Sequence, residues 1–323
     1  MDKSNAEQGL EPISLLSKSD SVTVTKMNHI IEVQYMEKTN RTGHIKKLDK
    51  DRYVDIRTGE IKEFDHSETR KDNYNSLRQT FKRLRYLINN NFEGKANELH
   101  ITLTYNTHVT DSKMLYEDFD KFIKRVRYRF KKQSSIDYLS VVEPQGSGRW
   151  HCHVLMRFND LDSIYIPNKF DKRTKKPVDA PMYDLWGNGW VTIHSLKDVD
   201  NIGAYLSAYL TDVELDNETL LTAVKEKREV VIREVEGKEK KFIKGGRLHM
   251  YPPGMNLYRS SKGIVPPDRD VMKFGDIKKV VGSAKPHYQK SYHIQNDEFE
   301  NTVTFLQYNT KRKTLSDNVR QDI

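Results

Sequence analysis

Residues 73–92 carry apolar side chains at the three- and four-residue spacing of one helix face: Leu77, Phe81, Leu84 and Ile88. Basic side chains, among them Arg78, Lys82 and Arg85, are distributed around that stripe. The pattern predicts an amphipathic basic helix. Its cations either follow a nucleic-acid backbone or simply face water, because runs of charge usually form a solvated surface.

The hydrophobic pattern after this helix alternates between the periods of strands and helices. Residues 99–105 alternate as a strand does, and residues 112–132 place Leu115, Phe119, Phe122, Val126 and Phe130 on one helical stripe. Two strand-like runs, 138–143 and 151–158, flank a turn-forming segment, 144–148. A strand at 190–193 and a helix within 199–210, capped near Asp198 or Asp200, complete the series. This order predicts an α+β fold, with a central sheet covered by helices on one face.

Patterning is weaker on both sides of this series, so the sequence predicts three regions. Residues 1–70 form an N-terminal extension that is loosely packed, with short β-like runs at 21–25 and 30–35. Residues 71–212 form the main domain. Residues 213–323 form a C-terminal extension, with an exposed hairpin around Gly237 and a basic, weakly patterned tail from about Gly282.

Composition narrows the class of protein. A formal net charge of +9 and a pI near 9.2 favour a polyanionic partner. The single cysteine, Cys152, excludes an internal disulfide framework and fits a reducing compartment. Neither a signal-like start nor a run of 18 apolar residues occurs, so we expect a soluble, cytoplasmic protein without a membrane partner. A phosphate-binding G-x-x-x-x-G-K-[ST] loop is also absent, which predicts no nucleotide cofactor.

The strand at 151–158 begins with two histidines one residue apart. Successive strand side chains point to opposite faces, so His151 and His153 share one face. Glu143 ends the preceding strand, and the hairpin returns it to the same sheet edge; Gln145 is a weaker candidate. Two imidazoles and a carboxylate suit Mg²⁺ or Mn²⁺ with open positions for water and phosphate. The alternative is a pair of ordinary strand histidines.

Two tyrosines, Tyr205 and Tyr209, lie four residues apart in the predicted helix and share one of its faces. Both phenols could therefore visit one site. Tyrosine attacks phosphorus once a metal and cations neutralise the phosphate, and the covalent intermediate conserves the phosphodiester energy. The alternative is core packing beside Ile202 and Leu206.

Taken in order, these motifs resemble the HUH endonucleases, and among them the phage- and plasmid-type rolling-circle replication initiators. The resemblance rests on ITLTYN at 101–106, EPQGSGRWHCH at 143–153, LWGNGWVTI at 185–193 and the paired tyrosines. It covers roughly residues 75–212 and also takes in GRLHMYPPG at 246–254, which looks like the continuation seen in initiators of low-GC Gram-positive bacteria.

The resemblance implies a five-stranded antiparallel sheet with flanking helices, the HUH fold, whose central strands carry the histidines. It implies a catalytic domain at 71–212 that nicks single-stranded origin DNA in a bacterial host. Tyr205 or Tyr209 would form a 5′-phosphotyrosyl link, and His151, His153 and Glu143 would hold the metal. Host helicase and polymerase would be the partners. Arg78, Lys82 and Arg85 would contact DNA.

Related two-tyrosine proteins carry lysines where this chain has Ala208 and Asp212, so Lys197, Arg149 or Arg157 would compensate the phosphate charge instead. Two other functions stay open. A relaxase or single-strand transposase would use the same chemistry on a transfer origin or a transposon end. A DNA-binding regulator without catalysis would need none of the histidines, Glu143 or the tyrosines.

Overall fold

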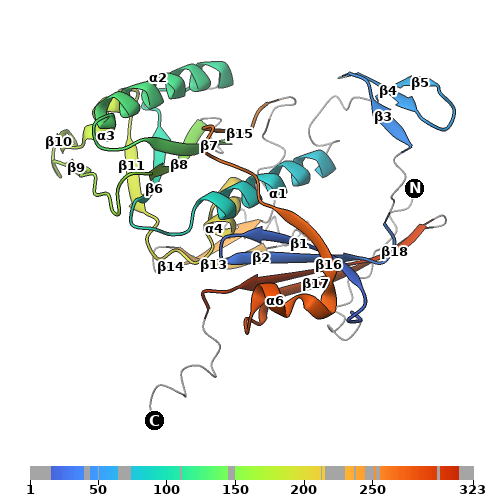
Figure 1. Cartoon of the computed structure of the whole chain (residues 1–323). Coiled ribbons are helices and arrows are strands. Elements are labelled where there is room, and N and C mark those ends of the chain that lie inside the picture. The colour runs from blue at the N-terminus through green and yellow to red at the C-terminus, as the bar shows by residue number, and fades with distance from the viewer. Residues whose placement is uncertain are drawn as a thin grey trace, which may run out of the picture. The chain divides into compact units, whose positions relative to one another are not determined.

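The structure is a computed structural model that describes residues 16–39, 44–49, 51–64, 74–109, 111–144, 150–211, 213–214, 230–235, 238–243, 251, 255–296 and 299–312 (Figure 1). The chain divides into two compact units. Unit 1 combines Met1–Ser67 with Pro267–Ile323, and unit 2 spans Glu68–Pro266. Among the described residues, none of the helices combines the length and apolar character needed to cross a membrane.

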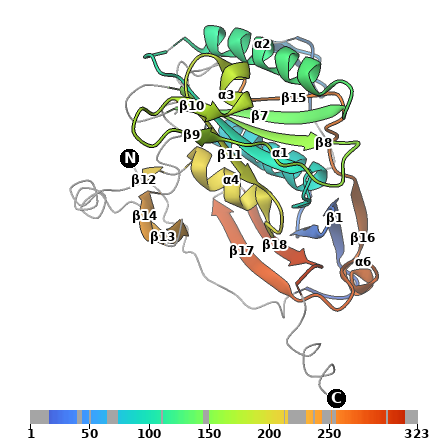
Figure 2. The same cartoon turned by 90° about the vertical axis from the view of Figure 1, so that its left-hand side faces the viewer.

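Unit 2 is built on a five-stranded sheet with the order β11-β6-β8-β7-β15 (Figure 2). Its strands are β6 (Glu98–Thr104), β7 (Ile136–Pro144), β8 (Trp150–Phe158), β11 (Val191–Ser195) and β15 (Tyr258–Ser260). Every pairing within it is antiparallel. The predicted α+β class and antiparallel five-stranded sheet are therefore confirmed, and the strand that begins with the two histidines lies at the centre.

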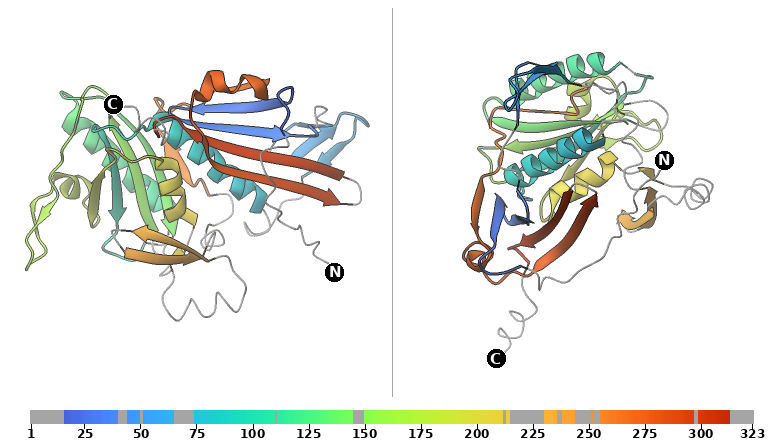
Figure 3. Two further views of the ribbon diagram at one scale, coloured as in Figure 1. Left: turned by 90° about the horizontal axis from the view of Figure 1, so that it is seen from below. Right: turned by 90° about the vertical axis from the view of Figure 1, so that its right-hand side faces the viewer.

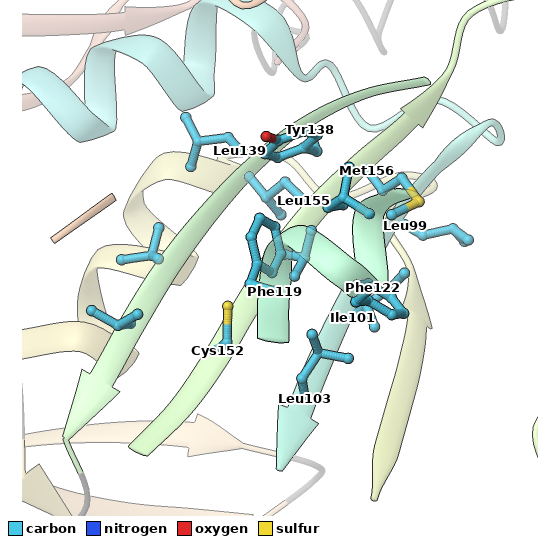
Figure 4. Packing of buried hydrophobic residues seen from close by; sticks show 14 of the residues in the cluster. Leu99, Ile101, Leu103, Phe119, Phe122, Tyr138, Leu139, Cys152, Leu155 and Met156 are labelled. Carbon is cyan, nitrogen blue, oxygen red and sulfur yellow. The ribbon is translucent and has the colours of Figure 1, made fainter. Parts of the chain in front are cut away.

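Helices cover both faces of this sheet, whereas the sequence pattern predicted cover on one. They are α1 (Tyr74–Asn91), α2 (Ser112–Phe130), α3 (Pro181–Trp186) and α4 (Ile202–Thr211). Phe119 and Phe122 of α2 lie against one face, beside Ile101 and Cys152 (Figure 4). The helices α1 and α4 cover the other face (Figure 2). The prediction of a single covered face was wrong because β8 is buried on both sides for most of its length.

Smaller sheets complete unit 2. The strands β9 (Lys169–Phe170) and β10 (Pro177–Asp179) pair as a short antiparallel hairpin. The strands β12 (Val213–Glu214), β13 (Val230–Val235) and β14 (Lys238–Ile243) form a three-stranded sheet. β13 pairs antiparallel with β14, as the alternating pattern around Gly237 predicts, although Gly237 itself lies outside the described residues.

Unit 1 joins the two ends of the chain in one sheet of order β16-β1-β2-β18-β17 (Figure 3). The strands are β1 (Ser21–Met27), β2 (Ile30–Met36), β16 (Arg269–Lys273), β17 (Pro286–Asn296) and β18 (Phe299–Asn309). A short helical segment, η3 (Phe274–Asp276) and α6 (Lys278–Val281), follows β16. A separate three-stranded sheet contains β3 (Ile45–Lys47), β4 (Arg52–Asp55) and β5 (Ile61–Glu63).

This sheet differs from the expectation of two separate extensions. Val24 and Val33 from the N-terminal segment are fully buried with Leu306 from the C-terminal segment, so neither segment is loosely packed. The weakly patterned tail contains the two longest strands of the sheet. Local periodicity does not record which distant strand completes a sheet, and each segment buries its apolar face only when the other supplies strands.

Cys152 provides a test of this packing. Burial raises the pKa of its thiol to about 12, so almost none of it is the reactive thiolate near pH 8. We expect the native protein to resist a thiol-reactive disulfide reagent and the urea-unfolded protein to release one equivalent per chain, because Cys152 is the only cysteine. Rapid labelling of the native protein, followed by absorbance, would contradict the burial of β8.

Candidate functional site

Strand register brings the predicted metal ligands together on one face of the unit 2 sheet. Glu143 of β7 is paired directly with His151 of β8, and His153 is paired with Thr102 of β6. Residues directly opposite in antiparallel strands share a face, with their Cβ atoms about 4.5–5.5 Å apart. Glu143, His151 and His153 therefore emerge side by side, as the sequence predicted. Gln145 lies outside the described residues.

The carboxylate of Glu143 lies between the two imidazoles. Its Oε2 atom is 2.7 Å from Nε2 of His153 and 3.8 Å from Nδ1 of His151. Glu143 and His153 are buried, at 4% and 6% exposure, while His151 is partly exposed. A buried carboxylate needs compensating partners. The hydrogen bond with His153 supplies one, and the exposed side of His151 leaves the site open to an incoming ligand.

A third histidine, His100 of β6, completes a row that sequence reasoning missed. Its Nε2 atom lies 3.1 Å from Nδ1 of His153, and the two rings stack with their centroids 5.3 Å apart. Thr102 Oγ1 also lies 3.3 Å from the same His153 nitrogen. Both ring nitrogens of His153 are therefore engaged, which fixes its orientation. A histidine in an otherwise apolar and threonine-rich strand was the available signal, but its use depends on pairing β6 with β8.

His100 is neutral in the folded protein. Desolvation by burial lowers its pKa well below the usual value, and the neighbouring His153 and His194 lower it further. His194 of β11 is paired with His100, and their ring centroids lie 6.2 Å apart. The row Glu143, His153, His100 and His194 thus crosses four adjacent strands on one face.

The helix α4 places Tyr205 over this row. The ring of Tyr205 meets that of His100 edge to face, with 6.2 Å between centroids, and Tyr205 is 40% exposed. An aromatic residue packed only as core would be covered, so the core-packing alternative does not describe Tyr205. Tyr209 lies one helical turn later in α4, and its side chain is outside the part that the structure describes.

Two local contacts set the position of α4. Asn201 Oδ1 accepts from the backbone N–H of Ala204, which is the capping role expected of Asp198 or Asp200. The backbone N–H of Gly203 donates to Asn89 Oδ1 of α1 at 2.8 Å, and a Cβ at Gly203 would lie 2.6 Å from that same oxygen. Only glycine permits this close approach of the two helices.

The structure separates the three cations expected to compensate phosphate charge. Arg157 is already committed at the far end of β8, where it forms an ion pair with Asp137 at 2.9 Å and donates to the carbonyl of Asn91. It lies four residues from His153, about 13 Å along the strand. Lys197 is exposed after β11, and Arg149 lies outside the described residues. Arg157 is therefore not the compensating group.

The three basic residues predicted to contact DNA lie on α1 but are not equally available. Lys82 and Arg85 are half-buried, and both stack on the ring of Tyr86, at 5.4 and 5.8 Å from its centroid. The side chain of Arg78 lies outside the described residues. Arg83 of the same helix is exposed. Part of the basic character of α1 thus serves packing of this helix.

The donor set suits a hard divalent cation. Two adjacent ligands at 2.0–2.1 Å from an octahedral ion lie about 3 Å apart. The separations of Glu143 Oε2 from the two imidazoles, 2.7 and 3.8 Å, lie on either side of that value. Among the described residues, no three His, Cys, Asp or Glu side chains are already arranged as a metal cluster. Coordination would therefore replace the Glu143–His153 hydrogen bond and draw His151 inward by less than about 1 Å.

Comparison with known proteins bears on this segment of the chain. Residues 98–214 match the family model of the replication-associated protein ORF2. The match begins at the first residue of β6, ends at the last residue of β12 and includes His100, Glu143, both histidines of β8 and both tyrosines. It supports a role in replication. Neither the curated proteins nor the solved structures show a significant match to the chain.

The neutral state of His100 generates a pH prediction for the metal-free protein. In the unfolded chain this imidazole takes up a proton below about pH 6.5, whereas the folded protein resists it, so the unfolded state binds more protons. Stability is therefore complete above about pH 6.5 and falls as pH decreases, by at most about 1.4 kcal/mol per pH unit from this group. The slope should weaken in His100→Phe, measured as the urea midpoint of Cys152 protection between about pH 5 and 8.

His194→Phe is the matched control, since it changes the adjacent but exposed histidine of the same row. It should keep the parent pH slope. An unchanged slope in His100→Phe would show that His100 titrates as it does in water.

Proposed function

We propose that the protein initiates rolling-circle replication as a metal-dependent, site-specific single-strand DNA endonuclease and ligase. The observation that carries this proposal is the position of Tyr205. A half-exposed phenol lies beside a row of histidines that ends in a buried carboxylate, all within the segment that matches a replication-associated family. A DNA-binding regulator without catalysis would need none of these residues. The family match favours replication over transfer or transposition.

Glu143, His151 and His153 would hold Mg²⁺ or Mn²⁺, which supplies Lewis-acid polarisation of the scissile phosphate. The protein's own contribution is orientation. His153 can bind a cation through Nε2 only if its proton is on Nδ1, and that N–H then donates to Nε2 of His100 at 3.1 Å. His100 is thus a positioning residue that selects the tautomer of a ligand. Hydrogen-bond partners of this kind fix the ring of a metal-bound histidine.

Tyr205 would act as the nucleophile. A bond forms between its phenolic oxygen and phosphorus, the bond from phosphorus to the 3′ oxygen breaks, and the phenolic proton is lost while the leaving oxygen gains one. The products are a 5′-phosphotyrosyl link and a free 3′-OH. The reverse reaction by a 3′-OH rejoins the strand, so the same site cleaves and ligates. A polymerase would extend the 3′-OH, and a helicase of the host would separate the strands.

The first prediction concerns the three ligands. Alanine at His151 or His153 should reduce formation of the protein–DNA adduct by roughly 10³-fold, because the Lewis acid contributes several kcal/mol to the transition state. DNA affinity should stay within about 3-fold, since phosphate contacts dominate binding. The measurement is a denaturing gel with labelled single-stranded DNA and Mn²⁺. His194→Ala is the control and should retain activity. Nicking by His151→Ala in a chelator would overturn the assignment.

A second prediction concerns the order of the tyrosines. Rolling-circle replication needs a second cleavage while the first tyrosine still holds the 5′ end, and two phenols on one helical face meet that need. Because Tyr205 lies next to His100, we expect it to perform the first cleavage. Tyr205→Phe should lose initiation by at least about 10³-fold, Tyr209→Phe only termination, and the double variant both. Gel assays on substrates with one and two origins separate these steps.

Normal initiation and termination by Tyr209→Phe would make this a one-tyrosine enzyme. Normal initiation by Tyr205→Phe would remove Tyr205 from the first step.

A further inference from the structure

The hairpin of β9 and β10 carries a concentration of positive charge that the proposed chemistry does not use. Between its strands lie Lys172, Arg173, Lys175 and Lys176, all exposed. The single acid of this turn, Asp171, is occupied in shaping it, because its Oδ1 atom accepts from the backbone N–H groups of Arg173 and Thr174. The turn therefore presents four exposed cations to the solvent.

Aromatic side chains gather at the base of this hairpin. Phe170 of β9, Tyr183 of α3 and Trp190 form a cluster whose ring centroids lie 4.9 to 5.9 Å apart. Trp190 is 42% exposed, whereas Trp150 and Trp186 are buried at 5% and 0%. Partly exposed tryptophan next to lysine and arginine is the combination with which proteins bind unpaired nucleotides, since bases stack on the ring and cations meet the phosphates.

The cluster lies at the end of the sheet where the candidate ligands lie. The carbonyl of Trp190 accepts from the backbone N–H of Thr104, and Thr104 is paired with His151, which is paired with Glu143. Trp190 is thus two strand spacings from His151, about 10 Å. Figure 2 shows β9 and β10 beside β11 and α3. A strand of DNA passing from the ligands over the edge of the sheet would span this distance within about two nucleotides.

The charge distribution agrees with a polyanion bound on this unit. Unit 2 contains 34 of the 55 Lys and Arg residues and 26 of the 46 Asp and Glu residues, so it holds eight of the nine excess positive charges. Two runs stand out within it, the hairpin and the second half of α2. Only the hairpin combines its charge with a tryptophan at the end of the sheet where Glu143 and His151 lie, among the residues that the structure describes.

We propose that the β9–β10 hairpin and Trp190 form a single-strand DNA-binding arm that holds nucleotides adjoining the cleaved phosphate. The arm rests on the proposed function for its role, although its binding can be measured without cleavage. Stacking needs an exposed base face, which a duplex does not offer, so the arm favours single strands. Its cations bind phosphates without reading sequence.

Trp190 itself reports occupancy of the arm. Binding of a dT oligonucleotide to Tyr205→Phe protein in a chelator should quench tryptophan emission, because only Trp190 of the three is accessible to a base. Trp190→Phe should lose this quenching yet keep affinity within about 3-fold by anisotropy, since phenylalanine still stacks. Trp190→Ala should bind at least about 5-fold more weakly, the lower limit for one stacked base.

Charge-matched variants test the cations. Replacing Lys172, Arg173, Lys175 and Lys176 by Gln should lower the salt dependence of single-strand binding by roughly 0.7 log units per lost contact. The control replaces the exposed residues Lys124, Arg129, Lys131 and Lys132, in and just after α2, by Gln, which removes the same three lysines and one arginine from across the sheet. This control should keep the parent slope.

Equal loss of slope in both variants, or quenching that survives Trp190→Phe, would overturn the arm. These outcomes are separable from failure of the proposed function. If the parent protein forms no adduct but Trp190 is quenched, the nickase fails and the arm stands. If the adduct forms and the hairpin variant binds as the parent does, the nickase stands and the arm fails.

Discussion

The antiparallel register of β8 with its two neighbours is the constraint on which the site depends. Pairing with β7 places Glu143 opposite His151, and pairing with β6 places His100 within hydrogen-bond distance of His153. Because side chains alternate between faces, a slip of one residue would turn the histidines toward α2 and Cys152 toward α4. The apolar residues of the α2 face oppose such a slip, since they would be exchanged for imidazoles. The packing of that face thus holds the chemistry of the other.

The second requirement is that a helix cross this face closely enough to bring a phenol to the row. Gly203 allows α4 to approach Asn89 of α1, and the same turn of helix carries Tyr205 toward His100. The result is a layered site, in which the sheet supplies the ligands and the helix supplies the nucleophile. Neither layer has to move for both to meet one phosphate, so most of the cost of orientation is met during folding.

Short-range features of the fold and site were predictable from the sequence. The hairpin of β7 and β8 follows from alternation and its turn, so Glu143, His151 and His153 could be placed on one face. The spacing of Tyr205 and Tyr209 was equally readable. His100 was not, because its role depends on pairing between β6 and β8, which are separated by a helix and another strand. The sheet shared by the chain ends was missed for the same reason, since β2 pairs with β18 across most of the sequence.

The central claim is that Glu143, His151 and His153 bind one divalent cation beneath Tyr205. The most direct measurement is anomalous X-ray scattering from crystals of the Tyr205→Phe protein grown with Mn²⁺. The account predicts one strong peak within coordination distance of all three side chains, on the sheet face that α4 covers. A Mn²⁺ peak bound elsewhere in unit 2, with Glu143 still hydrogen-bonded to His153, would contradict it.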